Sequence, residues 1–275
     1  MAFRIALCSE VYKLPLEETI VRVAKLGFDG IEIAPFTVAE SVEDVSHERR
    51  TTIRNVALDA GIEIIGLHWL LVSPKGLHLT TPDERVRQLT VDYLKALVHF
   101  CADLRGRFLV LGSPKQRSVL DGDDPAAAKA RAAEGLRKVA EVCDERSVYL
   151  FLEPLSPAET NFVNTVEEAR DLVAAIAHHR VGYMLDCKAM SAMPGGIVGT
   201  IRHHGKSAGH FHANEPSGLA PGMGTTNFAE ILGCLNDSGY LGWVSAEPFD
   251  YSPDSDTVAR AALDALRRAS ESRNK

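Results

Sequence analysis

Short apolar runs alternate with longer amphipathic segments along the whole chain. The runs are rich in β-branched and aromatic residues, which is typical of buried strands, and 3–8 is the first of them. In the longer segments the apolar residues recur at helical spacing, as in 16–26, which ends at Gly27, a favourable helix terminator. The pattern predicts eight strands: Phe3–Cys8, Gly30–Ala34, Ile62–Trp69, Arg107–Leu111, Val148–Glu153, Val181–Asp186, Ser207–His212 and Leu241–Glu247.

A helix is predicted after each strand. Pro82, behind Thr81, is expected to open the longest of them, because proline is favoured in the first turn of a helix. Thr165 is the expected N-cap of another. The predicted helices are Leu16–Leu26, Val45–Ala60, Pro82–Leu104, Pro125–Glu145, Val166–His178, Ile197–His203, Phe228–Ser238 and Asp256–Ser270.

Eight strand–helix units in 275 residues match the size of a (β/α)8 TIM barrel, which is the predicted fold class, with residues 1–275 as a single domain. A doubly wound sheet is the structural alternative. Such a sheet usually carries a glycine-rich phosphate loop after its first strand, whereas CSEVYKLP in this position contains no glycine.

Composition narrows the class of protein. Hydrophobic residues make up 45% of the chain, and 37 acidic against 30 basic residues give a net charge of −7. That charge disfavours nucleic-acid and membrane partners. Five widely spaced cysteines form no CxxC pair, and no apolar stretch reaches the roughly 18 residues that span a bilayer. With no secretory leader recognised, we expect reduced thiols and a cytoplasmic protein.

Candidate chemistry follows the last four predicted strands. FLEP, MLDC, HFHAN and SAEP each place an acid or an imidazole at a strand end, where a barrel of this type has its active site: Glu153, Asp186, His212 and Glu247. Taken singly, each acid is as well explained as an ordinary loop residue. Together they form an oxygen-rich set that suits one divalent ion, Mn²⁺ foremost, with Mg²⁺, Co²⁺ or Zn²⁺ as alternatives. Three clustered carboxylates would repel each other without a cation.

These four residues resemble the metal ligands of the sugar isomerase/epimerase superfamily. This is the xylose-isomerase-like barrel group of ketose 3-epimerases, hydroxypyruvate isomerase, and inosose isomerases and dehydratases. The resemblance covers essentially the whole chain and is most specific over 150–249. EPLSPAETNFVNT is similar to the epimerase stretch after strand 5, in which Glu159 matches a second glutamate near the substrate. HFHANEPSGLAPGMGTTNF is similar to the strand 7 motif and its glycine-rich loop.

The resemblance implies a metal-dependent isomerase or epimerase acting on a ketose or keto-sugar. In such enzymes the ion polarises the carbonyl and stabilises an enediolate formed by proton loss. Glu153 and Glu247 would be ligands as well as the acid/base pair, and Asp186 and His212 would be ligands only. Homodimers or homotetramers are common in the group. An apolar helical stripe would permit such assembly, although core packing explains it equally well: Val91, Leu94, Leu97 and Val98.

Five further residues are candidate substrate contacts. His68 and Trp69 end strand 3, where a sugar-binding wall would lie; the alternatives are a packed or solvent-facing histidine and a core tryptophan. Glu32 on strand 2 contacts substrate or forms an internal ion pair. His210 points to the same side of its strand as His212, and it orients a ligand or is a buried histidine. Lys188 directly follows the Asp186–Cys187 step.

Two departures from the ketose 3-epimerase pattern affect the expected substrate contacts. Ala189 and Gly218 occupy positions where those enzymes carry a sugar-contacting histidine and an arginine. Lys188 and His68 are candidate replacements. The losses keep a lyase alternative open, an enzyme eliminating from an inosose or 3-keto-glycoside. An abasic-DNA endonuclease would need more histidine ligands and a basic face, and a non-catalytic sugar-binding protein would have no use for four ligands.

Overall fold

The structure is a computed structural model that describes residues 2–271. Strands and helices alternate along these residues, and the strand pairings given by their register are all parallel. The described chain divides into two compact units. The first unit takes in 2–33, 55–64 and 184–271, and the second takes in 34–54 and 65–183.

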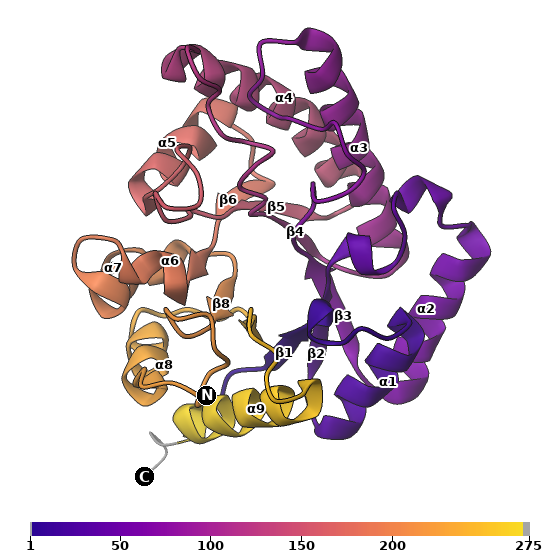
Figure 1. Cartoon of the computed structure of the whole chain (residues 1–275), viewed down its shortest axis with the longest axis vertical. Helices are drawn as coiled ribbons and strands as arrows, with labels where there is room; N and C mark the ends of the chain where they lie inside the picture. Colours follow the sequence, from indigo (N-terminus) through magenta and orange to yellow (C-terminus); the bar gives the residue numbers. More distant parts are fainter. Residues whose placement is uncertain (1, 272–275) are drawn as a thin grey trace. The chain divides into compact units, whose positions relative to one another are not determined.

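In the first unit the parallel strands follow the order β7–β8–β9–β1–β2. Helix α9 packs against α8 and β1, as Figure 1 shows. The strands are β1 (Ile5–Cys8), β2 (Gly30–Ile33), β7 (Leu185–Asp186), β8 (Phe211–Ala213) and β9 (Val244–Ala246), and the helices are α1 (Leu16–Leu26), α6 (Cys187–Ser191), α7 (Gly196–His204), α8 (Phe228–Asp237) and α9 (Ser255–Glu271).

In the second unit the strand order is β3–β4–β5–β6. Helix α4 packs against both α3 and α5 (Figure 1). Two elements, α2 (His47–Ala60) and β3 (Glu63–Leu67), run across the boundary between the units. The others are β4 (Phe108–Leu111), β5 (Tyr149–Leu152), β6 (Val181–Tyr183), α3 (Glu84–Asp103), α4 (Pro125–Glu145) and α5 (Val166–Ile176).

Local signals fix the helix ends. Helices α1 and α4 have the bounds predicted from the sequence. Gly27 ends α1 with a φ of 102°, a left-handed conformation that glycine adopts without strain. The predicted start of α3 at Pro82 is wrong by two residues. The Asp83 carboxylate accepts the backbone N–H groups of Arg85 and Val86, and the helix therefore begins at Glu84.

The later strands are shorter than predicted. The predicted strand 181–186 is divided at Met184 into β6 and β7. Residues 205–207 form a 3-10 turn, and β8 begins only at Phe211. Leu241 is 87% exposed, and β9 begins at Val244. Helix α6 was not predicted. Asp186 ends β7, His212 lies in β8, and Glu247 directly follows β9.

The apolar stripe on α3 lies in the core. Its four residues are at most 3% exposed, so their spacing reflects packing within the chain: Val91, Leu94, Leu97 and Val98. The stripe therefore gives no support to an oligomer, which stays a prediction. Among residues 2–271, no helix has both the length and the apolar character that crossing a membrane would require.

Candidate functional site

Three of the predicted ligands lie together at the carboxyl ends of strands in the first unit. Asp186 ends β7, His212 lies in β8, and Glu247 directly follows β9. Each offers one ligand atom, and these atoms lie within 4.8 Å of one another. All three side chains are buried, at 4%, 0% and 2% exposure. The β7–β8 register pairs Asp186 with His212, which brings the ligands of neighbouring strands side by side.

Asn214 contacts both Asp186 and Glu247 through its side-chain amide. It was not among the candidate residues predicted from the sequence. Its amide nitrogen donates to Asp186 Oδ2 at 2.6 Å and reaches Glu247 Oε2 at 3.5 Å. Its amide oxygen accepts the backbone N–H of Lys188 at 2.8 Å. The strand alternation that groups His210 with His212 also puts Asn214 on their side. That spacing was the signal that would have found it.

Asp186 also begins helix α6. Its Oδ1 accepts the backbone N–H of Ala189 at 2.7 Å, an N-cap interaction. The Lys188 ammonium on this short helix lies 5.3 Å from the centre of the Phe249 ring. Gly218 has a φ of 88°, so a side chain there would be strained. Of the two departures noted in the sequence, Ala189 is thus a buried residue whose N–H is capped by Asp186, and Gly218 lies in a left-handed turn.

Glu32 on β2 lies in a buried network of polar side chains. Its fully buried carboxylate lies 2.8 Å from His210 Nε2 and 3.2 Å from His212 Nε2, and it accepts the Ser245 hydroxyl at 2.6 Å. Burial raises the pKa of Glu32, but its contacts with His210 and His212 outweigh burial and hold the pKa well below its usual value. His212 Nδ1 lies 3.0 Å from Glu247 Oε2.

Glu153 lies in the second unit, directly after β5, and is 6% exposed. Its carboxylate occupies the space left by the missing side chain of Gly112, where an added Cβ would stand 1.7 Å from Oε2. Beneath it lies Arg117, a buried arginine not singled out in the sequence. Its guanidinium donates to the carbonyl oxygens of Glu153 at 2.6 Å and Leu111 at 3.1 Å. Burial lowers the pKa of Arg117 to about 10, against the opposing charges of Glu153 and Glu159.

The other three candidates also lie in the second unit. Glu159 is half-buried and accepts the Ser156 hydroxyl at 2.9 Å. His68 follows β3 and is fully buried. Trp69 is half-buried in a left-handed conformation with a φ of 52°, and its ring is edge-on to that of Phe36 at 6.3 Å. Trp69 after β3, where a sugar-binding wall was expected, thus pairs with Phe36, which follows β2.

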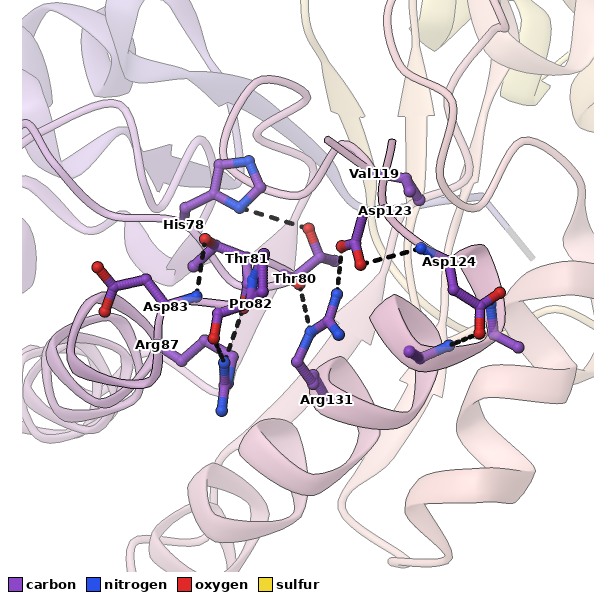
Figure 2. A network of polar contacts seen from close by, with 12 residues as sticks. His78, Thr80, Thr81, Pro82, Asp83, Arg87, Val119, Asp123, Asp124 and Arg131 are labelled. Atoms are coloured by element: carbon purple, nitrogen blue, oxygen red, sulfur yellow. Dashed lines mark hydrogen bonds and ion pairs between the residues drawn. The ribbon is translucent and has the colours of Figure 1, made fainter. Parts of the chain in front are cut away.

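Arginines fasten the loops that follow β3 and β4. Figure 2 shows Arg131 of α4 donating to the Thr80 carbonyl at 2.7 Å and pairing with Asp123. Arg87 of α3 donates to the carbonyls of Thr81 and Pro82 at 2.8 and 2.7 Å. Apart from the ion pair with Asp123, these contacts are made to main-chain carbonyls, and together they connect both loops to α3 and α4.

The donor set of the first unit fits a divalent cation. Two carboxylates and one imidazole nitrogen are the ligands that Mn²⁺, Mg²⁺, Co²⁺ and Zn²⁺ accept. The buried carboxylates of Asp186 and Glu247 also share the Asn214 amide, which places two negative charges near one another. A cation between them would offset their repulsion.

Comparison with known proteins identifies relatives over most of the chain. The sequence profile described as "Xylose isomerase-like TIM barrel" matches residues 20–269, which confirms the predicted (β/α)8 barrel. The D-psicose 3-epimerase of Ruminiclostridium cellulolyticum is 32% identical over 84% of this chain and 77% of its own length. A crystal structure of D-psicose 3-epimerase in the presence of D-fructose matches 97% of this chain and 96% of its own with a TM-score of 0.80 and 25% identity. An L-ribulose 3-epimerase structure shares the fold, with a TM-score of 0.85 and 23% identity over 99% of this chain and 95% of that one.

Proposed function

The chain belongs to the xylose isomerase-like TIM barrel family, and from this premise we propose that it is a divalent-metal-dependent ketose 3-epimerase. The isomerase class and the sugar isomerase/epimerase activity follow from the relatives. The observation that carries the proposal is the buried convergence of Asp186, His212 and Glu247 at the ends of three neighbouring strands. The relatives' epimerase names favour epimerisation over the elimination that the sequence left open.

Four residues would hold the ion in this proposal. Asp186, His212 and Glu247 supply three ligands, and Glu153 supplies the fourth. Burial supports Glu153, and so does its place at the end of β5, the end where barrels of this class have their active sites. When bound, the ion polarises a carbonyl and lowers the cost of charge on its oxygen. Mn²⁺ is the proposed native metal, with Mg²⁺, Co²⁺ or Zn²⁺ as alternatives.

Glu153 and Glu247 are the proposed acid/base pair. One carboxylate takes the proton from the carbon next to the carbonyl, and the other returns a proton to the opposite face. Both side chains are nearly excluded from water, at 6% and 2% exposure. Such burial keeps bulk water away from the reacting carbon.

The remaining candidates are proposed substrate contacts. Trp69 offers a half-buried ring, His68 a buried imidazole, and Glu159 and Lys188 half-buried charged groups. Lys188 and His68 would replace donors lost at Ala189 and Gly218. We also propose that the chain acts as a single domain on a small sugar, assembles as a homodimer or homotetramer, and works in the cytoplasm. All five cysteines are thiols in the structure, which supports that location.

The test is metal analysis of the purified protein, followed by Mn²⁺ addition and a ketose proton-exchange assay in deuterated water. We expect one ion per chain and deuterium at C3 of D-fructose or D-psicose. The Glu247→Gln variant should bind the ion more weakly. Failure of the wild type to take up Mn²⁺ would overturn the proposal, and loss of a β-substituent without exchange would favour the lyase.

A further inference from the structure

We propose that Glu32 is a positioning residue that fixes the ring of His212 so that Nδ1 is the nitrogen offered to the metal ion. Glu32 was a candidate substrate contact, but its fully buried carboxylate is directed to His210, His212 and Ser245. The inference rests on the metal centre of the proposed function. It assigns to β2 a role in a site whose ligands come from other strands.

The contacts with Glu32 indicate which ring nitrogen of His210 and His212 carries the hydrogen. An ionised carboxylate only accepts hydrogen bonds, so each partner must present a hydrogen. Nε2 of His210, at 2.8 Å, and Nε2 of His212, at 3.2 Å, therefore carry the N–H groups. A neutral imidazole protonated at Nε2 has its lone pair on Nδ1. For His212 that lone pair is the one available to a metal.

The same contacts fix the direction of that lone pair. His212 Nδ1 lies on the side of Glu247, 3.0 Å from its Oε2, while Nε2 is held on the opposite side of the ring by Glu32. The neighbouring His210 ring stands at 87° to the His212 ring with 5.0 Å between their centres. Both histidines are fully buried. A ring flip would aim the Nδ1 lone pair at the Glu32 carboxylate, which is electrostatically unfavourable, whereas beside Glu247 the lone pair and the carboxylate would both face the bound ion.

Ser245 provides a matched control. It is paired with His212 in the β8–β9 register, and its hydroxyl donates to Glu32 Oε2 at 2.6 Å. Removing the hydroxyl takes one hydrogen bond from the same carboxylate but leaves its charge and both histidine contacts. The Glu32→Gln variant keeps the shape but offers one acceptor and one donor end. It can satisfy only one of the two Nε2–H groups, so one histidine must change tautomer or turn.

The experiment compares wild type, Glu32→Gln and Ser245→Ala. Mn²⁺ dissociation constants are measured by the electron paramagnetic resonance signal of the free ion, and melting temperatures are measured without metal. We expect Glu32→Gln to weaken Mn²⁺ binding by about 10- to 100-fold, the usual range for a residue that orients a ligand, and Ser245→Ala by less than about 3-fold. Equal affinity of Glu32→Gln and wild type, or equal losses in both variants, would overturn the assignment.

A second measurement does not depend on the variants folding. In wild-type protein labelled with ¹⁵N-histidine and loaded with Zn²⁺, long-range ¹H–¹⁵N spectra distinguish the metal-bound ring nitrogen from the protonated one. We expect His212 to keep its Nε2–H and to bind through Nδ1. Binding through Nε2 would overturn the positioning role and leave the proposed function standing. A wild type that binds neither Mn²⁺ nor Zn²⁺ would overturn both.

Discussion

The two units organise their polar groups in opposite ways. At the strand ends of the first unit, side chains bind side chains: Asn214 bridges Asp186 and Glu247, and Glu32 gathers two histidines and Ser245. In the second unit the principal buried donor, Arg117, binds carbonyl oxygens, and Arg131 and Arg87 do the same in the loops of Figure 2.

The two kinds of network are expected to affect different properties, binding and rate in the first unit and stability in the second. A network between side chains sets where donor atoms point, so its loss should alter binding and rate more than folding. A network between arginines and the main chain sets where a loop runs, so its loss should act first on stability. Three substitutions test this division, and a fourth lies away from both networks.

The largest effect is expected for Glu247→Gln in the first unit. The amide has almost the shape of the carboxylate but is a poor base and a weak ligand, so proton exchange should fall by about 10³-fold. The free energy of unfolding of the metal-free protein should change by less than about 1 kcal/mol, because a charge leaves a cluster of carboxylates. Exchange rates and urea unfolding give the two numbers. Glu18→Gln, at an exposed position of α1, is the control. Loss of stability with proton exchange unchanged would reverse the comparison.

Arg117→Met in the second unit should act on stability. The side chain is 1% exposed and donates charge-assisted hydrogen bonds to the carbonyls of Leu111 and Glu153. Leaving both oxygens without this donor should lower the free energy of unfolding by about 3 kcal/mol. Urea unfolding measures it, with Arg105→Met at an exposed position expected to stay within about 0.5 kcal/mol. An unchanged midpoint would show that the buried guanidinium does not hold the loop.

Gly112→Ala tests both properties at once, because Gly112 lies in the second unit against the carboxylate of Glu153, a proposed ligand. The new Cβ would stand 1.7 Å from Glu153 Oε2, so the carboxylate must move. We expect Mn²⁺ affinity to fall by about 10-fold, measured by titration. Gly199→Ala in α7 is the matched control, since its Cβ meets nothing within 4 Å, and it should raise stability by about 0.5 kcal/mol. Equal Mn²⁺ affinity in both variants would contradict a role for Glu153 as a ligand.

The smallest effect is expected at an ion pair away from either network. Asp256 binds Arg22 and Tyr12, and the Arg22 hydrogen bond, followed by that of Tyr12, lowers the pKa of Asp256 to about 2. Its side chain is 40% exposed, so solvent screening keeps the effect of Asp256→Asn below about 1 kcal/mol at pH 7. A lowered pKa stabilises the fold above the unfolded value of 3.8, and this stabilisation is lost as the pH falls toward 2. The free energies of unfolding of wild type and Asp256→Asn should therefore converge as the pH falls through that window. A difference between them that stays constant would contradict the assignment.

Much of the architecture could be predicted because its signals are local. Glycine after α1 and an Asp124–Pro125 start for α4 fix helix ends from neighbouring residues alone, and both helices have the predicted bounds. The predicted starts of β8 and β9 were wrong, because apolar residues such as Leu241 continue a strand pattern beyond the last ladder partner. Pairing partners, which are remote in sequence, decide where a strand begins.

The site was predictable only in part for the same reason. Asp186, His212 and Glu247 follow apolar runs and could be recognised by position. Arg117 could not, because an arginine is normally exposed and nothing nearby in sequence indicates that 1% exposure or its two carbonyl partners. Glu32 was recognised as a candidate. Its role, however, depends on His210 and His212, which are 178 and 180 positions further along the chain.

The double attachment of Asp186 has a practical consequence. One oxygen of its carboxylate caps α6 through the Ala189 amide, and the other accepts the Asn214 side chain. Any displacement of this carboxylate must lengthen or shorten the capping bond, so the Ala189 amide proton senses the state of the centre from outside it. We therefore expect the backbone amide resonance of Ala189 to shift when a diamagnetic ion such as Zn²⁺ or Mg²⁺ binds at the proposed site, with no substrate present.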